Sequence, residues 1–204
     1  ASPTPDPAHE APAGSFEELG PAFPRYLAVL LLFTLGNASD AFLLLRAQEL
    51  GVPLAAIPLL WGALHVSKTA WSIPGGMAAD RVRPPVLIMA GWLLYAMVYG
   101  GFALADSAWQ IWALFALYGL YYGLTESPEK TLVAELAPSH LRARAFGIFH
   151  FAVGLGALPA SLLFGALWQW KGAPAAFTVG AGFALLSALL LPMALRGRQV
   201  GTRS

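Results

Sequence analysis

Charged side chains lie inside stretches that are otherwise apolar, where they are candidates for binding or proton transfer. Asp40 and Lys68 each interrupt a long apolar segment. Glu126, Glu129 and Lys130 cluster near the carboxyl end of another such segment, residues 108–135. An ionisable group is costly inside a lipid bilayer, where it binds a ligand, relays a proton or pairs with another charge. These five residues are the first candidates for a functional site.

Asp40 and Lys68 are expected at similar depths on successive helices. Asp40 lies about 22 Å from Arg25 along a helix that rises about 1.5 Å per residue. Lys68 lies about 21 Å from Leu54 by the same measure, on a segment that runs the opposite way. Pairing is the simplest way for both charges to survive in lipid, so one expectation is an ion pair that locks the two helices together. The other is that Asp40 stays free to bind an ion.

Each of these two segments also carries a stripe of polar side chains at helical spacing. The stripes are Thr34, Asn37 and Asp40 on the first segment, and Trp61, His65, Lys68 and Ser72 on the second. Residues three and four apart lie on the same face of a helix. Asn37 and His65 are therefore expected to line the same cavity as Asp40 and Lys68.

The segment over residues 108–135 has the densest group of polar side chains. Tyr118, Tyr122, Thr125 and Glu129 share one stripe, and Glu126 with Lys130 forms an i, i+4 pair. Pro128 removes a backbone donor, which predicts a kink beside these groups. We expect Tyr122, Glu126, Glu129 and Lys130 to line a substrate or ion cavity. For Glu129 and Lys130 the alternative is a salt bridge at the inner mouth.

The composition points to a membrane protein and excludes several other classes. Hydrophobic residues make up 57% of the 204 residues and charged residues only 11%, whereas soluble domains carry about a quarter. The net charge of +1 gives no reason to expect a nucleic-acid partner. The chain has no cysteine and its histidines are scattered, so we expect no metal site, no cofactor and no thiol nucleophile.

The apolar segments predict an all-α membrane protein. Residues 1–24 hold six prolines and four acidic residues, which is typical of a disordered linker. Residues 197–204 form a short polar tail. Between them, six segments have the length that spans a bilayer: 25–48, 54–79, 84–105, 108–135, 142–169 and 173–196.

The basic residues predict the orientation of these six spans. Cytoplasmic loops carry an excess of Lys and Arg. With the amino end inside, the inner side holds Arg25, Arg81, Arg83, Arg142, Arg144, Arg196, Arg198 and Arg203, and the outer side holds Arg46 and Lys171. Both ends of the chain are therefore expected in the cytoplasm.

The short loop between the second and third segments carries a motif. It reads Gly75-Gly76-Met77-Ala78-Ala79-Asp80-Arg81-Val82-Arg83-Pro84. It resembles the loop signature of the major facilitator superfamily (MFS), Gly-x-x-x-Asp-Arg-x-Gly-Arg-Arg. Gly76, Asp80 and Arg81 match the signature, whereas Arg83 replaces its second glycine. Such degenerate copies are common in the carboxy-terminal half of these transporters. The stretches 35–42 and 158–165 also look like bacterial members whose substrates are unassigned.

The resemblance implies an architecture. The chain would be the second six-helix half of a twelve-helix MFS transporter, namely helices 7–12, with residues 1–24 as the central cytoplasmic linker. Its partners would be the bilayer of a bacterial inner membrane and the missing amino-terminal half. In this family the first and fourth helices of each half line the cavity, in agreement with the positions of Asp40 and Glu126.

The resemblance also implies a mechanism. A secondary transporter moves a small molecule by alternating access, and a carboxylate in its cavity favours coupling to protons. Glu126 is the residue expected to handle substrate or protons. An acid-then-Arg pair such as Glu135 and Arg142 bonds in this family to the loop motif, so that Asp80 and Arg81 would help to hold the inner gate shut.

Two other classes of function remain open from the sequence. An intramembrane enzyme could use Asp40, Glu126 and Glu129, but the chain lacks a nucleophile–base grouping and a metal motif, so we expect no enzyme. The second class is a membrane scaffold or sensor that transports nothing, which a transport assay on the full-length protein would distinguish.

Overall fold

The computed structural model describes residues 16–196, which form a bundle of helices. Residues 1–15 and 197–204, which include most of the predicted linker and the predicted tail, lie outside the described residues. The helices are α1 (Ala22–Gly36), α2 (Ala41–Glu49), α3 (Ile57–Arg81), α4 (Pro84–Leu104), α5 (Ala108–Leu136), α6 (Arg142–Lys171) and α7 (Ala173–Ala194). Single 3-10 turns cover Phe16–Leu19, Leu54–Ala56 and Ser139–Leu141.

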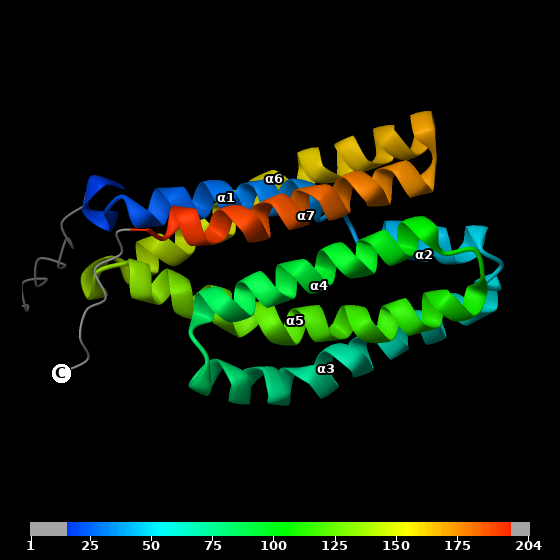
Figure 1. Cartoon of the computed structure of the whole chain (residues 1–204), viewed down its shortest axis with the longest axis horizontal. Coiled ribbons are helices and arrows are strands. Elements are labelled where there is room, and N and C mark those ends of the chain that lie inside the picture. The colour runs from blue at the N-terminus through cyan, green and yellow to red at the C-terminus, as the bar shows by residue number, and fades with distance from the viewer. Residues whose placement is uncertain (1–15, 197–204) are drawn as a thin grey trace, which may run out of the picture.

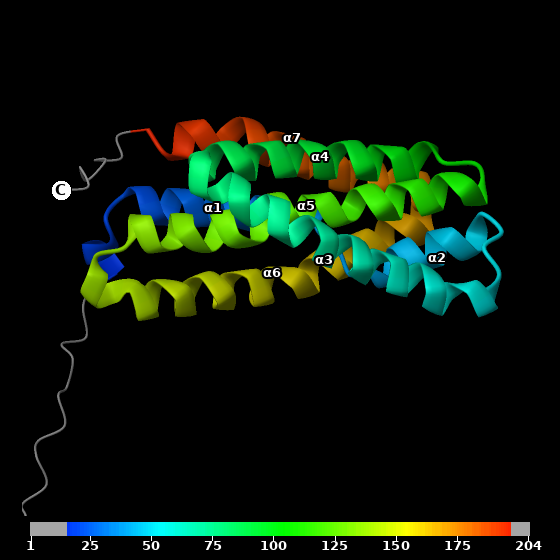
Figure 2. The same ribbon diagram turned by 90° about the horizontal axis from the view of Figure 1, so that it is seen from below.

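The helices run along one long axis and pack in a fixed order (Figure 1). α4 lies at the centre, between α5 on one side and α7 on the other, and α3 packs on α5. α1 packs against α6 and α7. The beginning of α1, the end of α7 and the α3–α4 and α5–α6 connections lie at one end of the bundle, at the left of Figures 1 and 2. The α2–α3, α4–α5 and α6–α7 connections lie toward the opposite end, and the break between α1 and α2 lies inside the bundle.

The first predicted span is not one helix. Residues 37–40 separate α1 from α2, so the prediction of a continuous helix over 25–48 is wrong. The four residues are Asn, Ala, Ser and Asp, and three of these types favour helix ends because their side chains compete for backbone hydrogen bonds. The carbonyl of Gly36 accepts a hydrogen bond from the hydroxyl of Tyr95 at 3.2 Å. The break is thus stabilised from α4, across the bundle.

An aromatic core fills the space around α4. Trp92, Tyr95, Tyr99 and Phe102 of this helix are completely or almost completely buried. Tyr95 and Tyr99 stack with their ring centroids 4.1 Å apart. The core also includes Phe33 of α1, Tyr118 and Tyr121 of α5 and Phe177 of α7. In lipid, such close packing holds helices together where the hydrophobic effect cannot.

Glycines set the closest contact in the bundle, between α3 and α5. A side chain at Gly75 would collide with the backbone of Gly123, and one at Gly123 would collide with the backbone of Trp71. Gly75, the first residue of the loop motif, therefore lets α5 come close to α3. Gly76, the residue that matches the loop signature, has open space where a side chain would lie.

The surface of the bundle suits a membrane. Among residues 16–196, four helical stretches are long and apolar enough to cross a bilayer: Ala22–Glu49, Pro84–Leu104, Ser139–Lys171 and Ala173–Ala194. α3, which carries Lys68, and α5, which carries Glu126, Glu129 and Lys130, fall outside this set, so the predicted spans 54–79 and 108–135 stay predictions. The outer face of α6 exposes Phe151, Leu155, Leu158 and Leu162. The chain is a multi-pass membrane protein.

Candidate functional site

Asp40 is the centre of a hydrogen-bond network at the break between α1 and α2. Its Oδ1 accepts a bond from the Tyr118 hydroxyl at 2.9 Å, and its Oδ2 accepts one from the Tyr122 hydroxyl at 3.3 Å. Lys68 Nζ lies 3.4 Å from the same Oδ2. The predicted contact between Asp40 and Lys68 is therefore confirmed, and two tyrosines of α5 join it.

Lys68 also contacts an aromatic face. Its Nζ lies 3.7 Å from the centroid of the Tyr122 ring. An ammonium group over a tyrosine ring is attracted by the negative face of the ring. The side chains of Lys68 and Asp40 are 23% and 19% exposed, so both are largely withdrawn from the surface. α3, α5 and the α1–α2 break thus meet at one partly buried ion pair.

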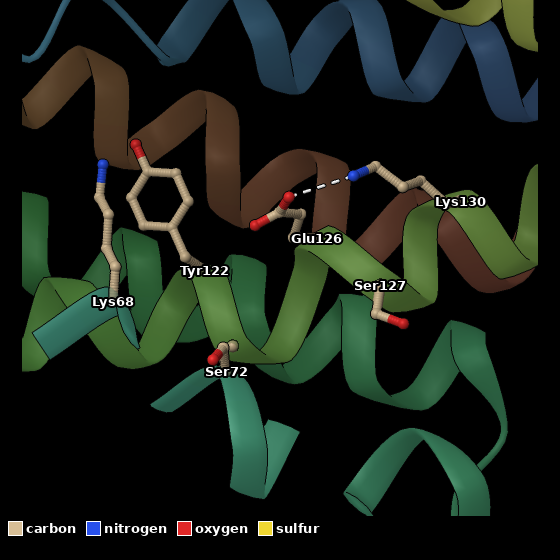
Figure 3. Close-up of a pocket in the computed structure, with 7 residues that line it drawn as sticks. Lys68, Ser72, Tyr122, Glu126, Ser127 and Lys130 are labelled. Atoms are coloured by element: carbon tan, nitrogen blue, oxygen red, sulfur yellow. Dashed lines mark hydrogen bonds and ion pairs between the residues drawn. The ribbon is translucent and has the colours of Figure 1, made fainter. Parts of the chain in front are cut away.

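A cavity of about 330 Å³ opens beside this ion pair, between α3 and α5 (Figure 3). Figure 3 shows Lys68 and Lys130 at its two ends, with Tyr122 and Glu126 between them. Lys130 Nζ bonds Glu126 Oε1 at 3.1 Å, as the i, i+4 spacing predicts. The full lining is Lys68, Ser72, Tyr122, Gly123, Glu126, Ser127 and Lys130.

Four of the eight predicted cavity residues do not line the cavity: Asp40, which reaches it only through its contact with Lys68, and three that lie elsewhere. Asn37 Oδ1 lies 3.2 Å from the Tyr95 hydroxyl, beside the aromatic core, and shares this single donor with the Gly36 carbonyl. His65 is exposed, and its Nδ1 lies 2.9 Å from the carbonyl oxygen of Trp61, one turn earlier on α3. Glu129 faces α4. None of the three lines the cavity.

The alternative predicted for Glu129, a salt bridge with Lys130, is absent. Glu129 Oε1 accepts a hydrogen bond from Trp92 Nε1 at 3.2 Å, while Lys130 bonds Glu126. Neighbouring residues on a helix do not face each other, whereas residues four apart do. α5 continues through Pro128, so this proline does not end the helix, and the kink expected there stays a prediction. A break in a helix occurs at residues 37–40.

The predicted gate residues share one end of the bundle but are not joined in this structure. Asp80 and Arg81 are exposed at the end of α3. Arg142 donates from its Nε to the carbonyl of Ala134 at 3.3 Å. Within residues 16–196, no ion pair links Asp80 or Arg81 to Glu135 or Arg142. The α3–α4 and α5–α6 connections are set apart from each other in both views (Figures 1 and 2).

Arg46 is a structural residue whose role the sequence did not reveal. Its Nε and Nη2 donate to the carbonyls of Phe102 and Ala105, at 3.2 and 2.8 Å. Its Nη1 bonds Glu49 at 3.0 Å, and Glu49 in turn accepts from Trp168 at 3.1 Å. A cation here satisfies the last carbonyls of α4 and complements its dipole. The only signal in the sequence was an arginine near the end of an apolar segment.

Comparison with known proteins identifies a matching family and two similar proteins. Residues 25–203 match the sequence profile of the Major Facilitator Superfamily. The chain is 35% identical over 176 residues to an uncharacterized MFS-type transporter of Methanocaldococcus jannaschii, covering 81% of this chain and 43% of the relative. It is 31% identical over 152 residues to the multidrug resistance protein MdtH of Yersinia pestis, covering 71% of this chain and 37% of the relative. The matches span about two fifths of each relative.

Proposed function

This chain belongs to the major facilitator superfamily, and we propose that it moves a small molecule across a membrane by alternating access. The observation that carries the proposal is the cavity between α3 and α5, with its two ion pairs beside a discontinuous helix. Broken helices with charged side chains next to a cavity are typical of secondary transporters, whose two halves rock around a fixed site.

We propose further that the chain is the carboxy-terminal six-helix half of a twelve-helix transporter. With α1 and α2 counted as one broken span, the described residues contain six long helical segments. The relatives extend well beyond the matched part, which supports a partner half. That half would cover the open side of the cavity and complete the path for the substrate.

The proposed orientation places both ends of the chain in the cytoplasm of a bacterium, with the helices in its inner membrane. Six arginines belong to segments that lie at the left end of the bundle in Figure 1, namely the beginnings of α1 and α6, the α3–α4 connection and the end of α7. They are Arg25, Arg81, Arg83, Arg142, Arg144 and Arg196. This excess of basic residues supports a cytoplasmic position for that end. Asp80, Arg81, Glu135 and Arg142 would form a closed gate there in another state, when the two connections approach each other.

Glu126 is the proposed coupling residue. It lines the cavity, bonds Lys130 at 3.1 Å, and leaves 66% of its side chain exposed in this structure. A carboxylate that bonds a lysine in one conformation and loses that bond in another gains and loses a proton as the states exchange. The proton gradient would then drive the substrate uphill.

A flux assay on the full-length protein tests this proposal. Proteoliposomes are loaded with the pH-sensitive dye pyranine, and candidate compounds are added until one produces a proton flux. Uptake of that compound is then compared with and without an imposed pH gradient. We expect Glu126→Gln to lose gradient-driven accumulation but to keep exchange of compound across the membrane. Asp106→Asn, at the far end of the bundle, is the matched control.

The outcomes separate the parts of the proposal. If Glu126→Gln still accumulates the compound, Glu126 is not the coupling residue. If it loses exchange as well, Glu126 binds substrate or supports the structure. If no compound in a broad panel moves protons or crosses the membrane with the wild-type protein, the transport function is wrong and a scaffold or sensor takes its place.

A further inference from the structure

Lys68 has hydrogen-bonding capacity that the protein leaves unused. An ammonium group has three N–H donors. Among the described residues, its only hydrogen-bond acceptor is Asp40 Oδ2, at 3.4 Å. Charge-assisted bonds of this kind normally measure about 2.7–2.9 Å. The other close neighbour is the face of the Tyr122 ring, and Lys68 itself lines the cavity. A cation with free donors therefore faces a space large enough for a ligand.

Asp40, in contrast, does not depend on Lys68. The hydroxyls of Tyr118 and Tyr122 donate to its two oxygens at 2.9 and 3.3 Å. If Lys68 turned into the cavity, Asp40 would keep both hydroxyl donors and would not be left as a buried acceptor without a partner. Moving Lys68 from Asp40 to a ligand is therefore inexpensive for the carboxylate that it leaves.

The acid in the cavity is a poorer anchor for a ligand. Glu126 already bonds Lys130 at 3.1 Å, and the two side chains are 66% and 49% exposed. A cationic ligand would have to displace a well-formed bond, at a position where solvent screens the gain. An anionic ligand at Lys68 would instead replace the long bond to Asp40 with a shorter one, at a position that is less exposed to solvent. The Lys68 end of the cavity therefore favours an anionic ligand more strongly than the Glu126 end favours a cationic one.

We propose that the cavity takes a small amphipathic organic anion, whose carboxylate replaces Asp40 as the partner of Lys68. The apolar body of the ligand would lie against Tyr122, and Ser72 and Ser127 offer hydroxyls to its polar edges. A cavity of about 330 Å³ is at the lower limit of small-molecule sites, which suits an aryl carboxylate. The proposal names the substrate class for the transport function proposed above and rests on it.

Binding of three matched probes to the purified full-length protein tests the exchange of partners. The probes are 2-naphthoate, 2-naphthylmethylamine and 2-naphthalenemethanol, measured by isothermal titration at a pH where the first is an anion and the second a cation. We expect 2-naphthoate to bind at least about tenfold more tightly than the other two, the factor of one charge-assisted bond.

Variants then distinguish competition from damage. Asp40→Asn removes the internal anion that competes for Lys68, so the Kd of 2-naphthoate should fall about fivefold, the factor that corresponds to about 1 kcal/mol. Lys68→Met should raise that Kd at least about tenfold, and the Asp40→Asn/Lys68→Met double variant, which removes both charges together, should bind as weakly. Lys171→Met, at the opposite end of the bundle from the gate, should bind like the wild type.

Three results would overturn the proposal: tightest binding of the amine, unchanged binding in the double variant, or weaker binding in Asp40→Asn. These outcomes are distinct from failure of the transport function. Binding of 2-naphthoate that depends on Lys68, without flux of any compound in proteoliposomes, would support the site and refute transport. Proton flux driven by the amine would support transport and refute the anion.

Discussion

Removing one partner of the Asp40–Lys68 pair should destabilise the bundle more than removing both. At 3.4 Å and an effective dielectric constant of about 20, the Coulomb attraction is about 5 kcal/mol, most of it offset by the cost of burial. Breaking a fully buried pair costs about 3–5 kcal/mol. These side chains are 19% and 23% exposed, so we expect about 2–3 kcal/mol for Asp40→Asn. Lys68→Met should cost less, because two tyrosines still hold Asp40.

The assay is a double-mutant cycle on unfolding in detergent. The double variant, Asp40→Asn with Lys68→Met, should lose only about 1 kcal/mol and recover expression relative to the worse single variant. The matched control is Glu126→Gln with Lys130→Met, an exposed pair whose coupling should be about 0.3–0.5 kcal/mol. Strictly additive effects at Asp40 and Lys68 would refute the reasoning, and Asp40 would then become a candidate for binding an ion by itself.

Three other perturbations test separate parts of the structure. Single cysteines at Ser2 and Ser204 should resist a membrane-impermeant thiol reagent in intact cells, and labelling at either would reverse the proposed orientation. Asp80→Asn should slow transport at normal abundance by weakening the proposed gate, and transport at the wild-type rate would remove Asp80 from it. Arg46→Met should lower the unfolding temperature, at a cost of about 2–3 kcal/mol, because two carbonyls of α4 lose a charged donor; an unchanged temperature would contradict this role.

Much of the site followed from charge and spacing alone. A lysine and an aspartate at equal depth in successive apolar segments predicted the Asp40–Lys68 contact, because each charge needs a partner in lipid. The i, i+4 spacing likewise predicted the bond between Glu126 and Lys130. These contacts depend on helix geometry and on the cost of burial, and both can be derived from a sequence.

The break between α1 and α2 could not be derived in this way. The polar residues at 34, 37 and 40 have helical spacing, which favoured a continuous helix over the weak helix propensity of Asn37 and Asp40. The end of α1 is fixed by the Tyr95 hydroxyl of α4, which donates a hydrogen bond to the Gly36 carbonyl. Helix propensity is a weak prior, and a tertiary hydrogen bond from a distant segment overrides it.

Contacts that join distant segments were also missed. Tyr118 shares the stripe of Tyr122, but only the packing of α5 beside the α1–α2 break brings both hydroxyls to Asp40. Glu129 was expected in the cavity, and its bond to Trp92 depends on which face of α5 meets α4. The order of helices in the bundle sets these partners, and periodicity within one segment contains no information about it.

Alternating access at this cavity is tested most directly by a single cysteine at Ser72. The Ser72 side chain lines the cavity, and the chain has no cysteine of its own. In a full-length protein without other accessible thiols, a thiol reagent would therefore label this position alone. Labelling by an impermeant thiol reagent is measured from each side of the membrane, with and without a saturating transported compound. We expect the compound to lower labelling from one side and raise it from the other. Simultaneous access from both sides, access from neither, or rates that the compound leaves unchanged would contradict the account.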